Sequence, residues 1–503
     1  MRSNQGSLLM MMIRFPLPSA YQGFPLGLFM LISASAVMAQ RPEADLVLGQ
    51  PTFFVSGSSA STSGVSGPQA VAVDPTSEKV FLADTLNHRV LRFQSVADLA
   101  NGAEAEAVFG QPDFTSNQIN RGQVSASADR LASPGEVFVD SFGTLWVSDS
   151  GNHRVLAFFN ASSQPMTGGS AGLVLGQGNY ADRGSGLSRS RMSLPKGICA
   201  DREQHVWVAD SLNHRVLRFD NVYSIGDGAN ASRVLGQSDF VSNDVDVPGD
   251  GGATAAELEL PKDLALDSAG NLYVAEETNH RVVVFANAAT LGDGVSAVRV
   301  LGQPDLTTVG PLSGMGAADL WYPYSLGIDE FDRLYVSQKF TNRVTWFNRV
   351  VTKGNGGDAD GVIGQDGFTQ NSSDTNQTSL TLPEGLGISG DGALWLADTG
   401  NHRILRLDPS VLDKVTPLLK VLGKRRLVTK RRKVVIRGTA SDNHAVTRVE
   451  YRTGAAWLPV SGQIAWRQTI KSVKRRVLVG FRAIDPAGNF SSVQKVTVLG
   501  KRK

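Results

Sequence analysis

The chain has 503 residues but only one cysteine, Cys199. A single cysteine cannot form an intrachain disulfide, so packing and hydrogen bonds must hold the fold together. Cys199 lies in the apolar run at residues 197–200, which favours a small core residue over a reactive thiol. The sequence also lacks a glycine-rich phosphate loop, a nucleophile elbow and paired cysteine motifs, so it offers none of the chemistries that depend on them.

Long apolar runs are also missing beyond residue 40, where no segment reaches the roughly 20 residues that a membrane span needs. The first 39 residues differ, because Arg2 and Arg14 precede an apolar stretch at residues 24–32, and small residues follow up to Ala39. This order predicts a signal peptide cleaved after Ala39. An uncleaved anchor is disfavoured because Pro25 shortens the apolar run. We therefore expect a mature chain that is secreted, periplasmic or part of the cell envelope, with no transmembrane span.

Charge is divided unequally along the chain, although the net charge is only +2. Residues 424–503 contain 20 lysines and arginines against three acids, a net of +17, which leaves −15 for residues 1–423. Such an abrupt change predicts a separate basic domain that begins near residue 424.

An internal repeat of 60 to 66 residues fills most of the chain before that point. Six segments of fifteen residues align without a gap, at 79–93, 144–158, 205–219, 271–285, 333–347 and 393–407. A short apolar run led by proline precedes each segment, and Val-Leu-Gly-Gln or a close variant follows it. A repeat of this length predicts one supersecondary unit that buries its core against its neighbours.

Each repeat can be divided into four strands. In the third repeat these are the proline-led run at 195–201, the β-branched and aromatic run at 205–209, the run at 214–219 after a turn at 210–213, and a Val-Leu-Gly strand. Six units of four antiparallel strands predict an all-β, six-bladed β-propeller over residues 40–423. Either the strand at Val47 or the one at Val421 could complete blade six; we favour Val47, because joining the chain ends protects exposed edges.

The sequence Asn-His-Arg-Val, present in four repeats and as Asn-His-Arg-Ile in a fifth, resembles the NHL repeat, which implies a six-bladed propeller. The motif residues are Asn87, His88, Arg89, Asn152, His153, Arg154, Asn213, His214, Arg215, Asn279, His280, Arg281, Arg343, Asn401, His402 and Arg403. Members of that family include RNA-binding modules, receptor sensor domains and a metal-dependent lyase. The resemblance therefore leaves the function to be argued from the site.

The repeated histidines and arginines are predicted to be structural. Five of the seven histidines occupy one repeat position, which favours locking of neighbouring blades over a single active site. His205 and His444 lie outside that position, so a three-histidine zinc site cannot be built away from the repeats. An acid precedes the arginine by five residues in five of the repeats, which predicts an ion pair in each hairpin.

Blade five departs most from the repeat. Its strand is led by Trp321, Tyr322 and Tyr324, and Gln338, Lys339 and Asn342 replace the acid, the turn and the histidine. Aromatic rings beside a lysine and amides predict a ligand-binding site. The alternative is that this blade has only repacked.

No cofactor or metal is predicted, with calcium as the alternative. Acidic loops at residues 243–250 and at Asp358 and Asp360 offer oxygen ligands of the kind that calcium prefers. Ordinary turn chemistry explains the same residues equally well.

Residues 424–503 alternate in strand-like runs at 433–440, 446–452 and 476–484, with a turn at 485–489. This pattern predicts a small β-sandwich. The stretches at 438–443 and 482–489 resemble bacterial immunoglobulin-like or fibronectin-like modules.

Together these features predict an exported, non-catalytic binding or scaffold protein. The propeller face would recognise a polysaccharide or a protein, and the basic sandwich would tether the molecule to an anionic cell-envelope surface. The alternative is a calcium-dependent propeller hydrolase, lactonase or lyase. Specific nucleic-acid binding is disfavoured, because affinity for phosphate chains depends on lysine and arginine, whereas residues 1–423 carry −15.

Overall fold

The computed structural model describes residues 41–245, 254–312 and 314–409, and, in the basic part, 418–424, 426–429, 433–441, 448–453, 457–462, 465–471, 476–484 and 491–500. The predicted signal peptide at residues 1–39 lies outside these ranges. Within them, no helix is long and apolar enough to cross a membrane.

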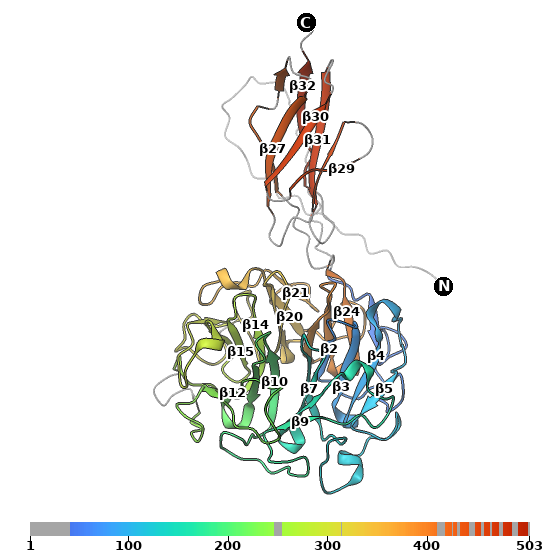
Figure 1. Ribbon diagram of the computed structural model, residues 1–503, viewed down its shortest axis with the longest axis vertical. Helices are drawn as coiled ribbons and strands as arrows, with labels where there is room; N and C mark the ends of the chain where they lie inside the picture. The colour runs from blue at the N-terminus through green and yellow to red at the C-terminus, as the bar shows by residue number, and fades with distance from the viewer. Residues whose placement is uncertain are drawn as a thin grey trace, which may run out of the picture. The chain divides into compact units, whose positions relative to one another are not determined.

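Six four-stranded antiparallel sheets account for the described residues up to 409 (Figure 1). In chain order of their first strands they are β2(Ala70–Val73), β3(Lys79–Asp84), β4(Arg89–Ser95) and β5(Ala107–Phe109); β6(Pro134–Val139), β7(Leu145–Asp149), β8(Arg154–Phe158) and β9(Leu173–Leu175); β10(Pro195–Ala200), β11(Val206–Asp210), β12(Arg215–Phe219) and β13(Arg233–Leu235); β14(Pro261–Leu266), β15(Leu272–Glu276), β16(Arg281–Phe285) and β17(Arg299–Leu301); β18(Pro323–Ile328), β19(Leu334–Gln338), β20(Arg343–Phe347) and β21(Gly361–Ile363); and β22(Pro383–Ile388), β23(Leu394–Asp398), β24(Arg403–Leu407) and β1(Leu46–Leu48). We number these sheets as blades one to six.

The first strands of the blades form a closed ring. Strand β2 contacts β6, and the contacts continue through β10, β14, β18 and β22 back to β2. These inner strands surround a central channel, and the other strands of each sheet lie progressively farther out. The predicted all-β propeller fold is confirmed.

Strand β1 completes blade six, as favoured from the sequence. Val47 pairs with Leu405 of β24, whereas Val421 lies in β25(Leu418–Leu422) and pairs with Gly438. The chain therefore leaves the propeller sheets before Leu418, earlier than the boundary predicted at residue 424.

Large aromatic side chains fill the space between neighbouring blades. Phe81, Trp146, Trp207, Tyr273, Tyr335 and Trp395 occupy equivalent places on the second strands and are fully buried. Trp146 of blade two, for example, packs in one core with Ile198 and Val206 of blade three. Burial of such large apolar areas supplies much of the stability of the ring.

Short 3-10 helices connect many of the strands. Five of them form the hairpin turns between second and third strands: η1(Thr85–Asn87), η4(Ser150–Asn152), η6(Ser211–Asn213), η8(Lys339–Thr341) and η10(Thr399–Asn401). The others lie in the connections: η2(Val96–Asp98), η3(Ile119–Gly122), η5(Ala161–Ser163), η7(Ala288–Thr290) and η9(Val350–Thr352).

The repeated histidine joins each blade to the next. Each of the five adopts a left-handed backbone conformation, with φ between 50° and 54°. Its Nδ1 accepts a hydrogen bond from the backbone N–H just before the next inner strand, as His153 does from Leu194 at 3.0 Å and His402 from Gly67 at 2.9 Å. In blade five, Asn342 Oδ1 does the same with Leu382 N–H at 2.9 Å. We call this contact the histidine latch.

The arginine of the motif forms a buried ion pair within its hairpin. Arg215 Nε lies 2.7 Å from Asp210 Oδ2, and blades one, two, four and six contain the equivalent pair, all fully buried. In blade five, Arg343 is hydrogen-bonded to the neutral Gln338 instead. Burial without an ion-pair acid lowers the pKa of Arg343 to about 10.

The basic part forms a two-sheet sandwich. One sheet has the order β25, β27(Lys433–Ser441), β30(Ala465–Lys471), and the other β26(Arg426–Thr429), β32(Gln494–Gly500), β31(Arg476–Ile484), β28(Arg448–Arg452), β29(Leu458–Pro459). Trp466 of the first sheet stacks on Phe481 of the second, with ring centroids 4.7 Å apart. Strands β27, β28 and β31 lie where the sequence predicts them.

Candidate functional site

The residue that follows each inner-strand proline differs from blade to blade. In order the six are Gln69, Gly135, Lys196, Lys262, Tyr324 and Glu384. Because the inner strands lie side by side around the ring, these residues form one layer at one end of the channel. The proline is the same in all six blades, whereas the residue after it varies. The fold therefore does not require a particular residue at this position.

The hairpins of blades four and five break a second repeated contact beside this layer. In the other blades a serine or threonine donates to the proline carbonyl of the next inner strand, as Ser211 Oγ does to Pro261 at 2.5 Å and Thr399 Oγ1 to Pro68 at 2.6 Å. Glu277 and Lys339 occupy the corresponding positions in blades four and five. Both replacements bring charge to the channel end.

These charges form a cluster with the layer, which we call the mouth cluster and define as Lys196, Lys262, Tyr324, Lys339 and Glu384. Lys262 Nζ lies 2.9 Å from Glu277 Oε2, and Lys339 Nζ lies 2.6 Å from Glu384 Oε1. The Tyr324 ring lies between these two lysines, with its centroid 5.8 Å from Lys262 Nζ and 5.0 Å from Lys339 Nζ.

The pKa values in the cluster reflect this crowding. Burial, followed by the charge of Lys262, lowers the pKa of Lys196 to about 8. Burial and the neighbouring charge of Glu384 raise the pKa of the Tyr324 phenol well above its usual value. At neutral pH Lys196 is therefore mostly an ammonium group and the Tyr324 phenol is neutral.

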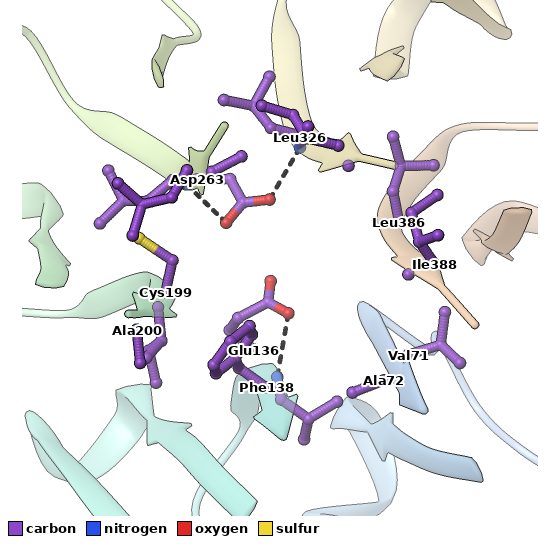
Figure 2. A pocket seen from close by; sticks show the side chains of 18 of the residues that line it. Val71, Ala72, Glu136, Phe138, Cys199, Ala200, Asp263, Leu326, Leu386 and Ile388 are labelled. Carbon is purple, nitrogen blue, oxygen red and sulfur yellow. Dashed lines mark hydrogen bonds between the residues drawn. The ribbon is translucent and has the colours of Figure 1, made fainter. Parts of the chain in front are cut away.

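A cavity of about 310 Å³ occupies the channel next to this layer. Its wall is largely apolar, with Val71, Phe138, Leu326 and Ile388 among the lining residues (Figure 2). Two acids interrupt it. Figure 2 shows the carboxyl groups of Glu136 and Asp263 pointing toward each other from β6 and β14.

Asp263 is held firmly. Its Oδ1 accepts from Leu264 N–H at 2.7 Å, and its Oδ2 accepts from Ser325 Oγ at 2.6 Å and Leu326 N–H at 2.8 Å. Burial nevertheless raises the pKa of Asp263 to about 6. Burial, and then the charge of Asp263, raise the pKa of Glu136 well above its usual value. The pair can thus offer one protonated and one ionised carboxyl, the requirement for general acid–base chemistry.

The six residues predicted to bind ligand divide between three places. Trp321 and Tyr322 line a surface groove of about 490 Å³ together with Phe340, Met315 and Asn371. We call this the blade-five groove. Tyr324 and Lys339 belong to the mouth cluster instead.

Gln338 and Asn342 serve the hairpin of blade five. Gln338 is buried and accepts hydrogen bonds from Arg343 and from Trp321 N–H at 2.8 Å. Asn342 forms the latch to Leu382. For Gln338 and Asn342, the alternative stated from the sequence therefore applies: these side chains have structural roles in a repacked blade.

Sequence reasoning missed the acids in the channel, the lysines on the inner strands and Phe340. The sequence did contain a signal. When the six repeats are aligned, most of the residues that directly follow the prolines are charged or polar, although they lie on the innermost strands. Asp263 and Glu136 stand one position further along and could have been found in the same way.

The acidic loops proposed for calcium gain no support. Residues 246–253 of the first loop lie outside the described part, and Asp360 of the second pairs with Lys353 Nζ at 2.9 Å. Across the described residues, no group of three or more histidine, cysteine, aspartate or glutamate side chains is placed to hold a metal ion.

Within this propeller, residues 192–219 and 258–285 match the NHL repeat family. Among curated proteins, human NHL repeat-containing protein 2 is 25% identical over 245 residues, covering 44% of this chain and 31% of the relative. Human Teneurin-1 is 26% identical over 276 residues, covering 52% of this chain and 10% of the relative. The chain thus spans about a third or less of the length of these relatives.

Solved structures that match this chain include a streptogramin B lyase, with a TM-score of 0.38 and 13% identity over 68% of this chain and 94% of that one. A gluconolactonase from Xanthomonas campestris gives a TM-score of 0.41 and 14% identity over 73% of this chain and 95% of that one. At such scores the likeness carries nothing about activity.

Proposed function

We propose that the protein is an exported binding protein whose propeller recognises a polysaccharide through the blade-five groove, while the basic sandwich tethers it to an anionic surface of the cell envelope. The observation that carries this proposal is the exposed aromatic surface of blade five. Phe340 is 50% exposed, and its ring packs against Tyr322 with centroids 4.9 Å apart.

The groove has the chemistry that sugars need. Flat aromatic faces bind the C–H face of a pyranose ring, and nearby polar groups satisfy its hydroxyls. Trp321 is fixed by a hydrogen bond from its Nε1 to the Gly314 carbonyl at 3.0 Å, so its ring is presented in one orientation. Asn371 adds an amide at the edge of the groove. A preorganised surface of this kind loses little entropy on binding.

The test is affinity electrophoresis of the mature protein through gels that contain xylan, chitosan or polygalacturonate. We expect at least one polymer to retard the protein and Phe340→Ala to abolish the retardation. Phe142→Ala is a matched control, because Phe142 is also 50% exposed and packs edge-on against a tyrosine, Tyr223, at 5.0 Å. Equal effects of both variants, or no retardation by any polymer, would refute the proposal.

A second candidate function is hydrolysis or elimination, favoured by the acid–base pair of Glu136 and Asp263 in the channel. In that case the retained polymer should release reducing ends during incubation, and Asp263→Asn should stop the release without changing the retardation. Release that persists in Asp263→Asn would exclude this pair as the catalyst.

A further inference from the structure

We propose that the mouth cluster binds a small hydroxycarboxylate, such as a uronic acid, with the carboxylate on Lys196 and a hydroxyl on Glu384. The chemistry follows from the cluster itself, whereas a polymeric source of the uronate rests on the proposed function. The blade-five groove adjoins this site in sequence, since Trp321 and Tyr322 precede Tyr324 and Phe340 follows Lys339.

Lys196 is the cation of the cluster without an acidic partner. Lys262 and Lys339 each have a carboxylate within 3 Å. The Lys196 ammonium donates to the neutral Gln69 Oε1 at 3.3 Å, and none of the described acids lies within ion-pair distance of it. A half-buried ammonium in this state binds an anion readily, because part of its desolvation has already occurred.

A glycine in the neighbouring blade makes room for the Lys196 ammonium. Gly135 takes the equivalent place in blade two, and a Cβ there would lie 3.0 Å from Lys196 Nζ and 2.6 Å from Ser150 Oγ. A larger residue would displace the lysine from the mouth. The absence of a side chain at Gly135 therefore lets the Lys196 ammonium lie directly over blade two.

Glu384 supplies the second contact. It is 2% exposed, and its Oε1 is occupied by Lys339. Its Oε2 has no partner within strict hydrogen-bond geometry among the described residues, although the Tyr324 hydroxyl is close enough to interact with the Glu384 carboxylate. The Tyr324 hydroxyl satisfies this buried oxygen only in part, and a ligand hydroxyl would complete its hydrogen bonding.

The two contacts come from opposite strands of the ring. Lys196 opens the inner strand of blade three and Glu384 that of blade six, and these blades are opposite in a ring of six. A ligand across the mouth needs an anionic group at one end and a donor at the other. A hydroxycarboxylate meets both needs, whereas a neutral sugar or a simple carboxylate meets one.

The experiment is calorimetric titration of the mature protein with galacturonate and, for comparison, galactose. We expect galacturonate to bind and galactose to bind at least about tenfold more weakly, since a charged hydrogen bond is lost. Lys196→Met should weaken galacturonate binding by about tenfold or more. Lys353→Met is the control, because Lys353 pairs with Asp360 elsewhere on blade five. Equal binding of the two sugars, or equal effects of the two variants, would overturn the inference.

A measurement on the unaltered protein guards against misfolding of the variant. Burial is the main cause that lowers the pKa of Lys196 to about 8; the charges of Lys262 and Lys339 lower it further, and those of Glu384 and Glu136 raise it. Affinity for galacturonate should therefore fall as the pH rises through about 8 and the ammonium is lost. Affinity that stays constant from pH 7 to pH 9.5 would contradict the role of Lys196.

The outcomes separate this inference from the proposed function. Retardation by a neutral polymer without galacturonate binding refutes the mouth site alone. Galacturonate binding without retardation by any polymer, including polygalacturonate, refutes polysaccharide recognition and identifies a free acid as the ligand.

Discussion

At the scale of single residues, the histidine latch shows why one side chain recurs around the ring. Its left-handed backbone turns the chain sharply, and its Nδ1 must be unprotonated to accept from the next blade. Burial lowers the pKa of all five latch histidines, which keeps them neutral. Asn342 shows that an amide oxygen can replace the imidazole.

The latch predicts a loss of stability in mild acid. Because the folded pKa values lie below the unfolded value of about 6.5, the unfolded chain takes up more protons below that pH. The stabilisation is therefore fully present above pH 6.5 and declines as the pH falls. Urea midpoints measured from pH 7.5 to pH 5 should decrease, and less steeply in His214→Asn.

The reciprocal variant is the control. Asn342→His introduces a sixth titrating latch and should steepen the decrease. If neither variant changes the slope, the pH dependence arises elsewhere. The structural role of the histidines was predictable from the sequence because it repeats. Their hydrogen-bond partners were not, because those lie on the next blade.

At the scale of elements, the inner strands pack more closely than their sequences reveal. A Cβ on Gly385 would meet the Gln69 carbonyl oxygen and the Cα of Ala70, and one on Gly197 would meet the Cα of Asp263. These contacts are with backbone, which cannot move without opening the ring. Strand order and strand positions could be read from the repeat, but this spacing depends on ring closure.

Gly385→Ala should therefore destabilise the propeller by about 1–3 kcal/mol, the range for overpacking a close-packed interior. Thermal unfolding would measure the loss as a lower melting temperature. Gly292→Ala serves as the control, since a Cβ there meets nothing within 4 Å. A Gly385→Ala protein as stable as the Gly292→Ala protein would show that blades one and six are not in close contact.

At the scale of the whole molecule, the charge division was evident from composition, while the candidate site was not. The mouth cluster is asymmetric and draws on blades three to six, so no single repeat contains it. On the sandwich, exposed Arg437 and Arg467 are direct cross-strand neighbours. Like charges placed opposite each other repel, and an anionic partner would relieve that repulsion.

The proposed tether predicts salt-sensitive binding to anionic polymers. On a dextran sulfate column the full-length mature protein should elute at lower salt after Arg437→Gln and Arg467→Gln together, because screening acts over about 8–10 Å at physiological salt. Arg202→Gln with Arg233→Gln, two exposed arginines of the propeller, should leave the elution unchanged. If the column does not retain the wild-type protein, the tether is refuted. The positive charge of the sandwich would then have another role, such as docking on the acidic propeller.

The pairing of β1 with β24 also has a consequence in time. A chain that emerges from the ribosome, or from an export channel, with its first residues leading releases β1 first and β24 almost 360 residues later. Blade six can be completed only when the whole ring has been delivered. Until then β1 has no partner strand and the ring stays open. We therefore expect the protein to remain sensitive to proteases until synthesis of the propeller is finished, and then to become resistant in one step.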